Sequence, residues 1–183
     1  MKSTIVFSAL FAAATLFTAC NNDGSNETKS EAATDSLTNT TGAAIKEEPV
    51  TYTAGNTKLN GYFAYDTAST AKKPIVLVVH EWWGLTDYPR MRAQQLAQLG
   101  YLAMAVDMYG EGNIADNPQA AQQAATPFYQ NPQLGQARLD AALAQAKMHP
   151  MADTSKTAAI GYCFGGTMVL NAAKLGSDFD GVV

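Results

Sequence analysis

Length, composition and charge exclude several classes of protein. The chain has 183 residues and a formal net charge of −4, a length that suits about one folded domain. Most of the excess negative charge lies before residue 49, and residues 49–183 carry ten acidic and nine basic side chains. A domain so close to neutrality lacks the basic surface of a nucleic-acid-binding protein. Two cysteines are too few for a disulfide scaffold.

Residues 1–19 have the pattern of a secretion signal. Lys2 precedes an apolar run that is too short and too interrupted by polar residues to span a bilayer. The segment "LFTAC" ending at Cys20 resembles a bacterial lipobox, in which the cysteine is acylated and becomes the mature N-terminus. We expect an exported lipoprotein that faces the periplasm or the cell exterior and meets the membrane only through this lipid. The alternative is a secreted protein with an ordinary Cys20.

Residues 20–48 are predicted to form a tether between the acylated cysteine and the folded domain. Residues 21–48 hold six acidic and two basic side chains and almost no large apolar one. Such a segment buries too little surface to offset the entropy of an ordered chain. We therefore expect a disordered spacer followed by a folded domain over residues 49–183.

The folded part alternates between strand and helix patterns. β-Branched and aromatic runs predict strands at 50–55, 59–66, 74–80, 101–107 and 156–162. Apolar residues at helical spacing predict helices at 89–100, 134–148 and 164–175, with a short helical patch around 120–125. On the helix at 134–148, Arg138 and Asp140 are expected to face outward. This order predicts an α/β fold, a mostly parallel sheet flanked by helices and incomplete at the C-terminus.

The stretch "GYCFGG" at 161–166 has the form of a nucleophile elbow, with Cys163 in the place of the usual serine. Gly161, Gly165 and Gly166 suit a turn whose flanking residues come too close together for side chains. The helix that follows favours negative charge at its start. Its first N–H, at Phe164, is placed to donate to an oxyanion.

Two other interpretations of this stretch remain open. Cys163 could be a buried structural thiol, since free cysteines often behave as small core residues. The glycines could instead form a phosphate or dinucleotide loop, with Asp180 as the acid about 20 residues further on. Such a loop needs glycine where Cys163 stands and normally follows the first strand of a sheet, so we favour the elbow.

A second motif, "VVHEWWGL" at 78–85, places His-Glu, a bulky pair and glycine after a strand. This is where α/β-hydrolases carry the second oxyanion donor. Together the two motifs make residues 50–183 resemble the dienelactone hydrolase family, a branch of the α/β-hydrolases with a cysteine nucleophile.

The resemblance implies a role for each matching residue. Cys163 would attack an ester or lactone carbonyl and form a thioester. Glu81 would contact the resting thiol and help to form the thiolate, although it could also be a solvent-facing loop carboxylate. The N–H groups of Trp82 and Phe164 would hold the oxyanion. The rings of Trp82 and Trp83 could cap the core or line the substrate pocket.

Two departures limit what the resemblance implies. The family's triad includes an aspartate and a histidine on loops after later strands. His80, His149 and Asp180 all lie before those strands. We therefore expect an N-terminal fragment or a truncated gene product. The family's founding activity also holds a substrate carboxylate with arginines, whereas Glu111 stands near one of those points and cannot bind a carboxylate.

These observations predict a hydrolase that cleaves a small carboxylic ester or lactone through a cysteine thioester, without a metal ion or cofactor. The chain itself would lack the triad aspartate and histidine. One alternative is a non-catalytic binding protein or pseudoenzyme on the same scaffold. A weaker alternative is a nucleotide-binding α/β domain that uses the loop 161–166.

Overall fold

The computed structural model describes residues 44–183. The predicted signal peptide, the acylated Cys20 and most of the predicted tether lie outside the described residues. The strands are β1 (Ile45–Ala54), β2 (Thr57–Asp66), β3 (Lys73–Val79), β4 (Leu102–Val106), β5 (Ala152–Gly161) and β6 (Gly181–Val182). The helices are α1 (Asp87–Gln98), α2 (Pro118–Gln130), α3 (Pro132–Lys147) and α4 (Phe164–Lys174).

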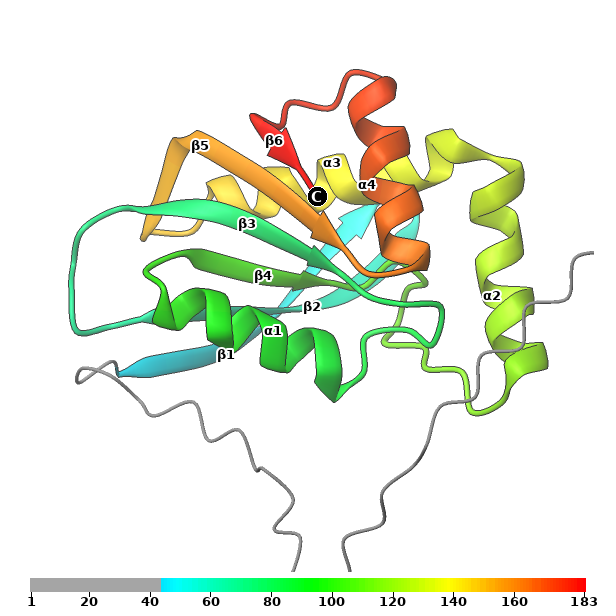
Figure 1. The fold of residues 1–183 in the computed structure, drawn as a ribbon, viewed down its shortest axis with the longest axis horizontal. Coiled ribbons are helices and arrows are strands. Elements are labelled where there is room, and N and C mark those ends of the chain that lie inside the picture. Colours follow the sequence, from blue (N-terminus) through cyan, green and yellow to red (C-terminus); the bar gives the residue numbers. More distant parts are fainter. Residues whose placement is uncertain (1–43) are drawn as a thin grey trace, which may run out of the picture. The chain divides into compact units, whose positions relative to one another are not determined.

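The strands form one sheet in the order β1-β2-β4-β3-β5-β6. β4, β3, β5 and β6 are parallel, whereas β1 and β2 are antiparallel additions at one edge (Figure 1). Val79 of β3 lies opposite both Val106 of β4 and Gly161 of β5. These three strands therefore end together, which gathers the loops that follow them at one edge of the sheet. The predicted α/β fold with a mostly parallel sheet is confirmed.

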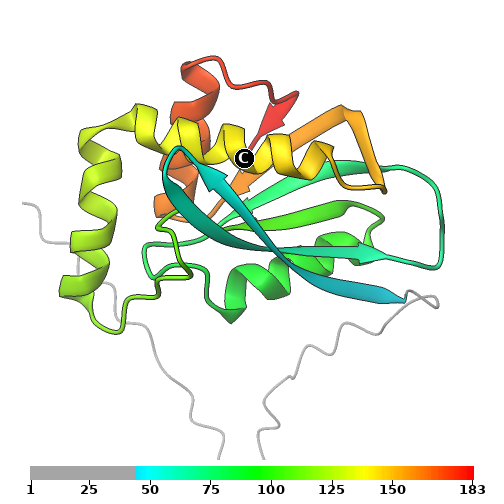
Figure 2. The same cartoon turned by 180° about the vertical axis from the view of Figure 1, so that it is seen from behind.

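Helices cover both faces of this sheet (Figures 1 and 2). α1 lies over β2, β4 and β3 on one face, and α3 and α4 pack on the other. Because side chains alternate along a strand, β3 contributes to two cores. Leu77 and Val79 join the core under α3 and α4, whereas Val78 packs with Ala93 of α1.

β1 begins earlier than predicted. The last four residues of the predicted tether, 45–48, pair with β2 instead of forming a spacer. Ile45 packs against the core beneath α1, and the Glu48 carboxylate accepts a hydrogen bond from the Tyr65 hydroxyl at 3.1 Å. These contacts hold a segment whose composition alone predicts disorder, so the domain boundary at 49 is wrong by four residues.

α2 is a full helix where the sequence predicts only a short patch. The Asn117 side chain accepts the N–H of Ala120 at 2.9 Å, and Pro118 starts the helix. Near the other end, the ring of Phe128 is buried and meets the ring of Phe164 edge to face, with centroids 5.6 Å apart. α2 thus packs against the residue that follows Cys163.

Arg138 is buried rather than facing outward, which corrects the prediction from its helical spacing. Its guanidinium donates to the Ala54 carbonyl and to the Thr57 hydroxyl, both at 2.9 Å. These bonds fasten the turn between β1 and β2 to α3. Asp140 is exposed, as predicted.

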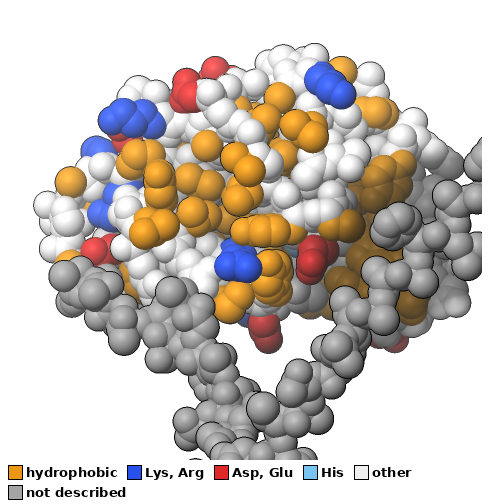
Figure 3. Space-filling view, viewed as in Figure 1, with side chains coloured by type: hydrophobic (Ala, Val, Ile, Leu, Met, Phe, Trp, Pro, Cys, Tyr) orange, Lys and Arg blue, Asp and Glu red, His pale blue; other side chains and the backbone are white. Residues whose placement is uncertain are grey.

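Hydrophobic side chains gather on the face of the sheet beside α1 (Figure 3). Ile160 and Tyr162, at the end of β5, are only partly buried there, and Val183 is 78% exposed. No helix within residues 44–183 combines the length and the apolar character that crossing a membrane requires.

Candidate active site

Cys163 occupies the turn between β5 and α4. It is exposed, with φ of 54° and ψ of −107°, a conformation that strains any residue with a side chain. A Cβ on Gly161 would lie 2.1 Å from the carbonyl carbon and oxygen of Gly165, so only glycine permits the turn. Gly166 has more room, because its Cβ would lie 3.3 Å from the Gly161 oxygen. This is the geometry of a nucleophile elbow.

Gly165 seats the elbow against the end of β3. A Cβ at this position would lie 2.5 Å from the Val79 oxygen and 2.7 Å from the His80 oxygen. The N–H of Tyr162 also donates to the Val79 carbonyl at 3.1 Å. The elbow therefore lies directly beside the loop that begins after β3.

That loop, residues 81–85, is held by its carbonyl groups. Three successive carbonyls each accept a hydrogen bond: Glu81 from the His80 ring, Trp82 from the Tyr109 hydroxyl at 2.8 Å, and Trp83 from the Ala115 N–H at 2.9 Å. The last two donors follow β4. The loops after β3 and β4 are therefore fastened to each other.

The backbone N–H groups of Trp82 and Phe164 are among those in these segments that have no acceptor within residues 44–183. In a trans peptide the N–H points away from the preceding carbonyl, so the bonded Glu81 carbonyl directs the Trp82 N–H away from the His80 ring. Phe164 is the first residue of α4, and the first N–H groups of a helix have no partner within it. Free N–H groups of this kind can hold an oxyanion.

Glu81 stands at the start of the same loop with a half-buried side chain. Within the described part of the chain, its carboxylate forms no ion pair and no hydrogen bond to the Cys163 thiol. The structure thus places both residues at one edge of the sheet but does not bring them into contact. The rings of Trp82 and Trp83 pack edge to face with centroids 5.2 Å apart, and Trp82 also packs against the core.

Neither histidine of the chain is placed as a base for Cys163. His80 is fully buried, its Nε2 accepts the Met108 N–H at 3.3 Å, and burial lowers its pKa to about 4. His149 follows α3, and its Nδ1 accepts the Met151 N–H at 3.1 Å. Residues 44–183 also hold no cluster of side chains suited to a metal ion.

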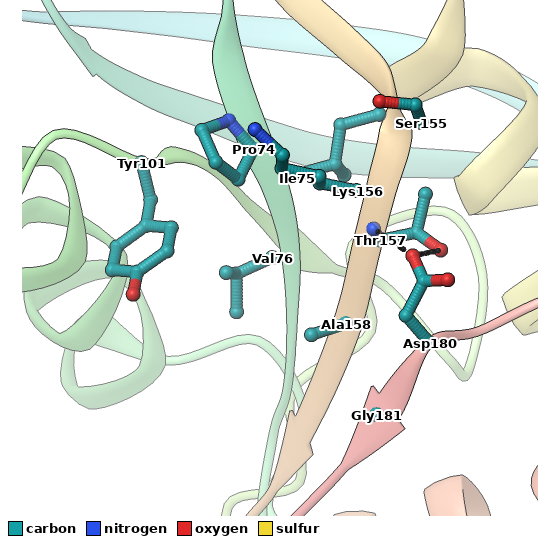
Figure 4. Close-up of a pocket in the computed structure, with 10 residues that line it drawn as sticks. All are labelled: Pro74, Ile75, Val76, Tyr101, Ser155, Lys156, Thr157, Ala158, Asp180 and Gly181. Atoms are coloured by element: carbon teal, nitrogen blue, oxygen red, sulfur yellow. Dashed lines mark hydrogen bonds between the residues drawn. The ribbon is translucent and has the colours of Figure 1, made fainter.

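Asp180 lies far along β5 from the elbow, at the groove drawn in Figure 4. Its carboxylate accepts hydrogen bonds from the Thr157 N–H at 2.7 Å and the Thr157 hydroxyl at 3.2 Å. The groove lies over the first halves of β3 and β5 and shares no lining residue with the elbow or with residues 81–85. Asp180 therefore joins β5 to β6 and is not part of the site.

Tyr109 and Tyr129 flank the elbow, although the sequence analysis does not single them out. Their rings pack against the Phe164 ring with centroids 5.4 and 5.7 Å away. Burial raises the pKa of both phenols, Tyr129 raises that of Tyr109 further, and a thiolate at Cys163 would raise both. Both therefore remain protonated at neutral pH. Tyr109 follows a strand end and could have been suspected, but Tyr129 lies on the part of α2 that the sequence does not predict.

Asp107 is buried at the end of β4 and orders the next loop. Its carboxylate accepts three backbone N–H groups: those of Gly110 at 2.8 Å, Gly112 at 2.9 Å and Asn60 at 3.0 Å. Glu111, in the same loop, is exposed with φ of 55° and lines a hollow together with Tyr109. The Glu111 carboxylate therefore lies near Tyr109, whose ring packs against Phe164 at the elbow.

Comparisons with known proteins match this chain to one family. The profile of the Dienelactone hydrolase family matches residues 59–183. Protein usf from Aquifex pyrophilus is 33% identical over 132 residues, 65% of this chain and 52% of that protein. The solved structure m3DLH is 34% identical with a TM-score of 0.74, over 76% of this chain and 58% of that one. The dienelactone hydrolase-like promiscuous phosphotriesterase P91, from metagenomic libraries, is 35% identical with a TM-score of 0.73, over 77% and 58%.

This chain spans about half the length of the curated relatives that it matches. The family profile nevertheless covers more than half of the chain, including both the elbow and the loop after β3. The chain belongs to the dienelactone hydrolase family.

Proposed function

We propose that this protein hydrolyses a small carboxylic ester or lactone with Cys163 as the nucleophile. The observation that carries the proposal is an exposed thiol on a strained elbow, followed directly by the unbonded N–H of Phe164 and packed against the start of the loop that contains Trp82. A nucleophile next to oxyanion donors is the equipment that acyl transfer needs. The start of α4 also favours negative charge on the sulfur.

The step assigned to these residues is acylation. The Cys163 thiolate attacks the carbonyl carbon, and the carbonyl electron pair moves to oxygen as the carbon–sulfur bond forms. The N–H groups of Trp82 and Phe164 stabilise that oxyanion. When the carbonyl reforms, the ester carbon–oxygen bond breaks, the released alkoxide takes a proton from solvent water, and a thioester remains on Cys163.

Hydrolysis of the thioester then requires a base that activates water. Neither histidine of this chain supports that role, because the His80 ring is bonded to the Glu81 carbonyl and the Met108 N–H, and Nδ1 of His149 accepts the Met151 N–H. The chain spans about half the length of its curated relatives. We therefore assign only the acylation half of the reaction to the described residues.

The proposed substrate is a neutral ester or lactone. Glu111 and Tyr109 line the same hollow, and the Tyr109 ring packs against Phe164 next to the nucleophile. A carboxylate at Glu111 repels an anionic acyl group and cannot replace the arginine that would bind one.

Stopped-flow measurement of p-nitrophenolate release from p-nitrophenyl acetate tests the proposal. We expect a burst of about one equivalent per chain, as acyl-enzyme formation requires, and no burst from Cys163→Ala. Cys20→Ala is the matched control, because it removes the other cysteine and leaves the burst unchanged. A succinate half-ester of p-nitrophenol, which carries a carboxylate, is expected to react more slowly. An undiminished burst from Cys163→Ala contradicts the proposal.

We also propose that the protein is exported and anchored by a lipid on Cys20. The support is the signal pattern of residues 1–19 and the small residues before Cys20. In this arrangement the acidic residues that precede the domain act as a spacer from the membrane surface.

A further inference from the structure

His80 joins two segments of the site through its two ring nitrogens. Nδ1 is bonded to the Glu81 carbonyl, and Nε2 lies 3.3 Å from the backbone nitrogen of Met108. A carbonyl can only accept a hydrogen bond and a backbone N–H can only donate one. The imidazole is therefore the neutral tautomer with its proton on Nδ1.

The bond to Glu81 acts on the peptide group that carries the Trp82 N–H. The carbonyl of Glu81 and the N–H of Trp82 belong to one planar unit and point in opposite directions. The other contact of this carbonyl is the Gly84 N–H at 3.5 Å, which is too long to hold it firmly. The His80 ring is thus the main restraint on the direction of the Trp82 N–H.

The surroundings of His80 hold the ring itself in place. The His80 ring stacks on the Phe164 ring at an interplanar angle of 13°, with centroids 5.7 Å apart. The His80 and Tyr109 rings meet edge to face, with centroids 4.9 Å apart. Phe164 carries the other N–H that we assign to the oxyanion hole. The charged group that acts on His80 is Asp107, whose carboxylate already accepts three backbone N–H groups.

We propose that His80 is the positioning residue of the oxyanion hole: its Nδ1–H fixes the Glu81 carbonyl so that the Trp82 N–H faces the reacting carbonyl. The inference rests on the proposed function, since this N–H has a task only if Cys163 transfers acyl groups. His80 itself never touches the substrate and moves no proton.

Two substitutions separate the two bonds of the ring. In His80→Asn, the side-chain amide can place an N–H where Nδ1 stood. This variant keeps the bond to the Glu81 carbonyl but loses the acceptor for the Met108 N–H. In His80→Gln, the side-chain oxygen can take the place of Nε2. This variant keeps the bond to the Met108 N–H but loses the donor to the Glu81 carbonyl. His149→Gln is the control, because His149 lies outside the site.

The readout is the rate of Cys163 acetylation by p-nitrophenyl acetate divided by its rate of alkylation by iodoacetamide. Both reactions need the thiolate, but alkylation forms no oxyanion, so the ratio reports on the hole alone. We expect the ratio to fall about 100-fold in His80→Gln, the loss typical of one oxyanion donor. His80→Asn and His149→Gln should stay near the wild-type ratio. An unchanged ratio in His80→Gln, or an equal fall in His80→Asn, overturns the proposal.

Nitrogen-15 NMR of the wild-type protein tests the same inference without any activity. We expect His80 to be neutral at pH 7 with its proton on Nδ1. A proton on Nε2, or a charged ring, overturns the positioning role even if Cys163 is acetylated normally. If the wild type is alkylated but never acetylated, the proposed function fails instead, and the tautomer still decides whether His80 holds Glu81.

Discussion

The buried ring of His80 links the pH dependence of folding to the loop beside Cys163. A histidine in the unfolded chain titrates near its ordinary pKa of 6.5, whereas burial lowers the pKa of His80 to about 4, against smaller opposing effects of Glu81 and Asp107. Between these pH values the unfolded chain binds a proton that the native state does not. The free energy of unfolding therefore falls as the pH falls through this window.

This difference predicts a loss of about 3 kcal/mol in the free energy of unfolding between pH 7 and pH 4. Urea unfolding at several pH values measures it. His80→Asn should remove this component, so that its stability curve is flatter over the same range. A variant with the same slope as the wild type would show that His80 is not the group responsible.

Single residues differ in how well the sequence predicts their roles. Gly161 and Gly165 could be predicted because their spacing around Cys163 has a steric cause that needs no distant partner. Arg138 could not be, because its position on α3 suits a solvent-facing side chain. Its acceptors, the Ala54 carbonyl and the Thr57 hydroxyl, come from a turn brought near only by folding. The same holds for the His80 bond to Met108.

At the scale of elements, the junction of β5 and α4 depends on the close contact between Gly161 and Gly165. A methyl group on Gly161 would lie 2.1 Å from the Gly165 backbone, and no flexible side chain is there to move aside. The turn must therefore deform, and β5 or α4 must shift.

Gly161→Ala is expected to cost on the order of 3 kcal/mol in folding free energy, the upper range for overpacking. In a domain of this size that lowers Tm by roughly 10 °C. Gly181→Ala is the matched control, since a Cβ at Gly181 meets nothing within 4 Å, and its Tm should hardly change. Equal melting temperatures for the two variants would argue against the tight turn.

The strands and helices were largely predictable because each apolar run has the period of its element. Two of the boundaries that the sequence misses have clear physical causes. β1 starts at Ile45 because pairing with β2 and the contact of Glu48 with Tyr65 outweigh an acidic local composition. α2 extends to Gln130 because Phe128 packs against Phe164, a contact between residues far apart in the sequence.

At the scale of the whole molecule, the parallel strands β4, β3 and β5 end at one edge, which brings the loops with Cys163, Trp82 and Tyr109 together. The order of elements predicts this edge, but not which side chains fasten the loops to one another. The N-terminal segment predicts a separate property, attachment to a membrane, and this prediction rests on the sequence alone.

Expression of the full chain in a Gram-negative host tests that attachment. We expect the protein to incorporate labelled palmitate and to fractionate with membranes, because two or more acyl chains are needed for stable anchoring. Cys20→Ala should lose the label and leave the membrane fraction, whereas Cys163→Ala should keep both. Palmitate labelling that survives Cys20→Ala would contradict the lipid anchor.

The central claim is that Cys163 accepts an acyl group with the help of the loop after β3. The most direct measurement is peptide mass mapping of the protein quenched during its reaction with p-nitrophenyl acetate. The account predicts one acetyl group per chain, on the peptide that contains Cys163. The account would be contradicted if Cys163 is alkylated by iodoacetamide, which shows that the thiol is reactive, but carries no acetyl group after the reaction with p-nitrophenyl acetate.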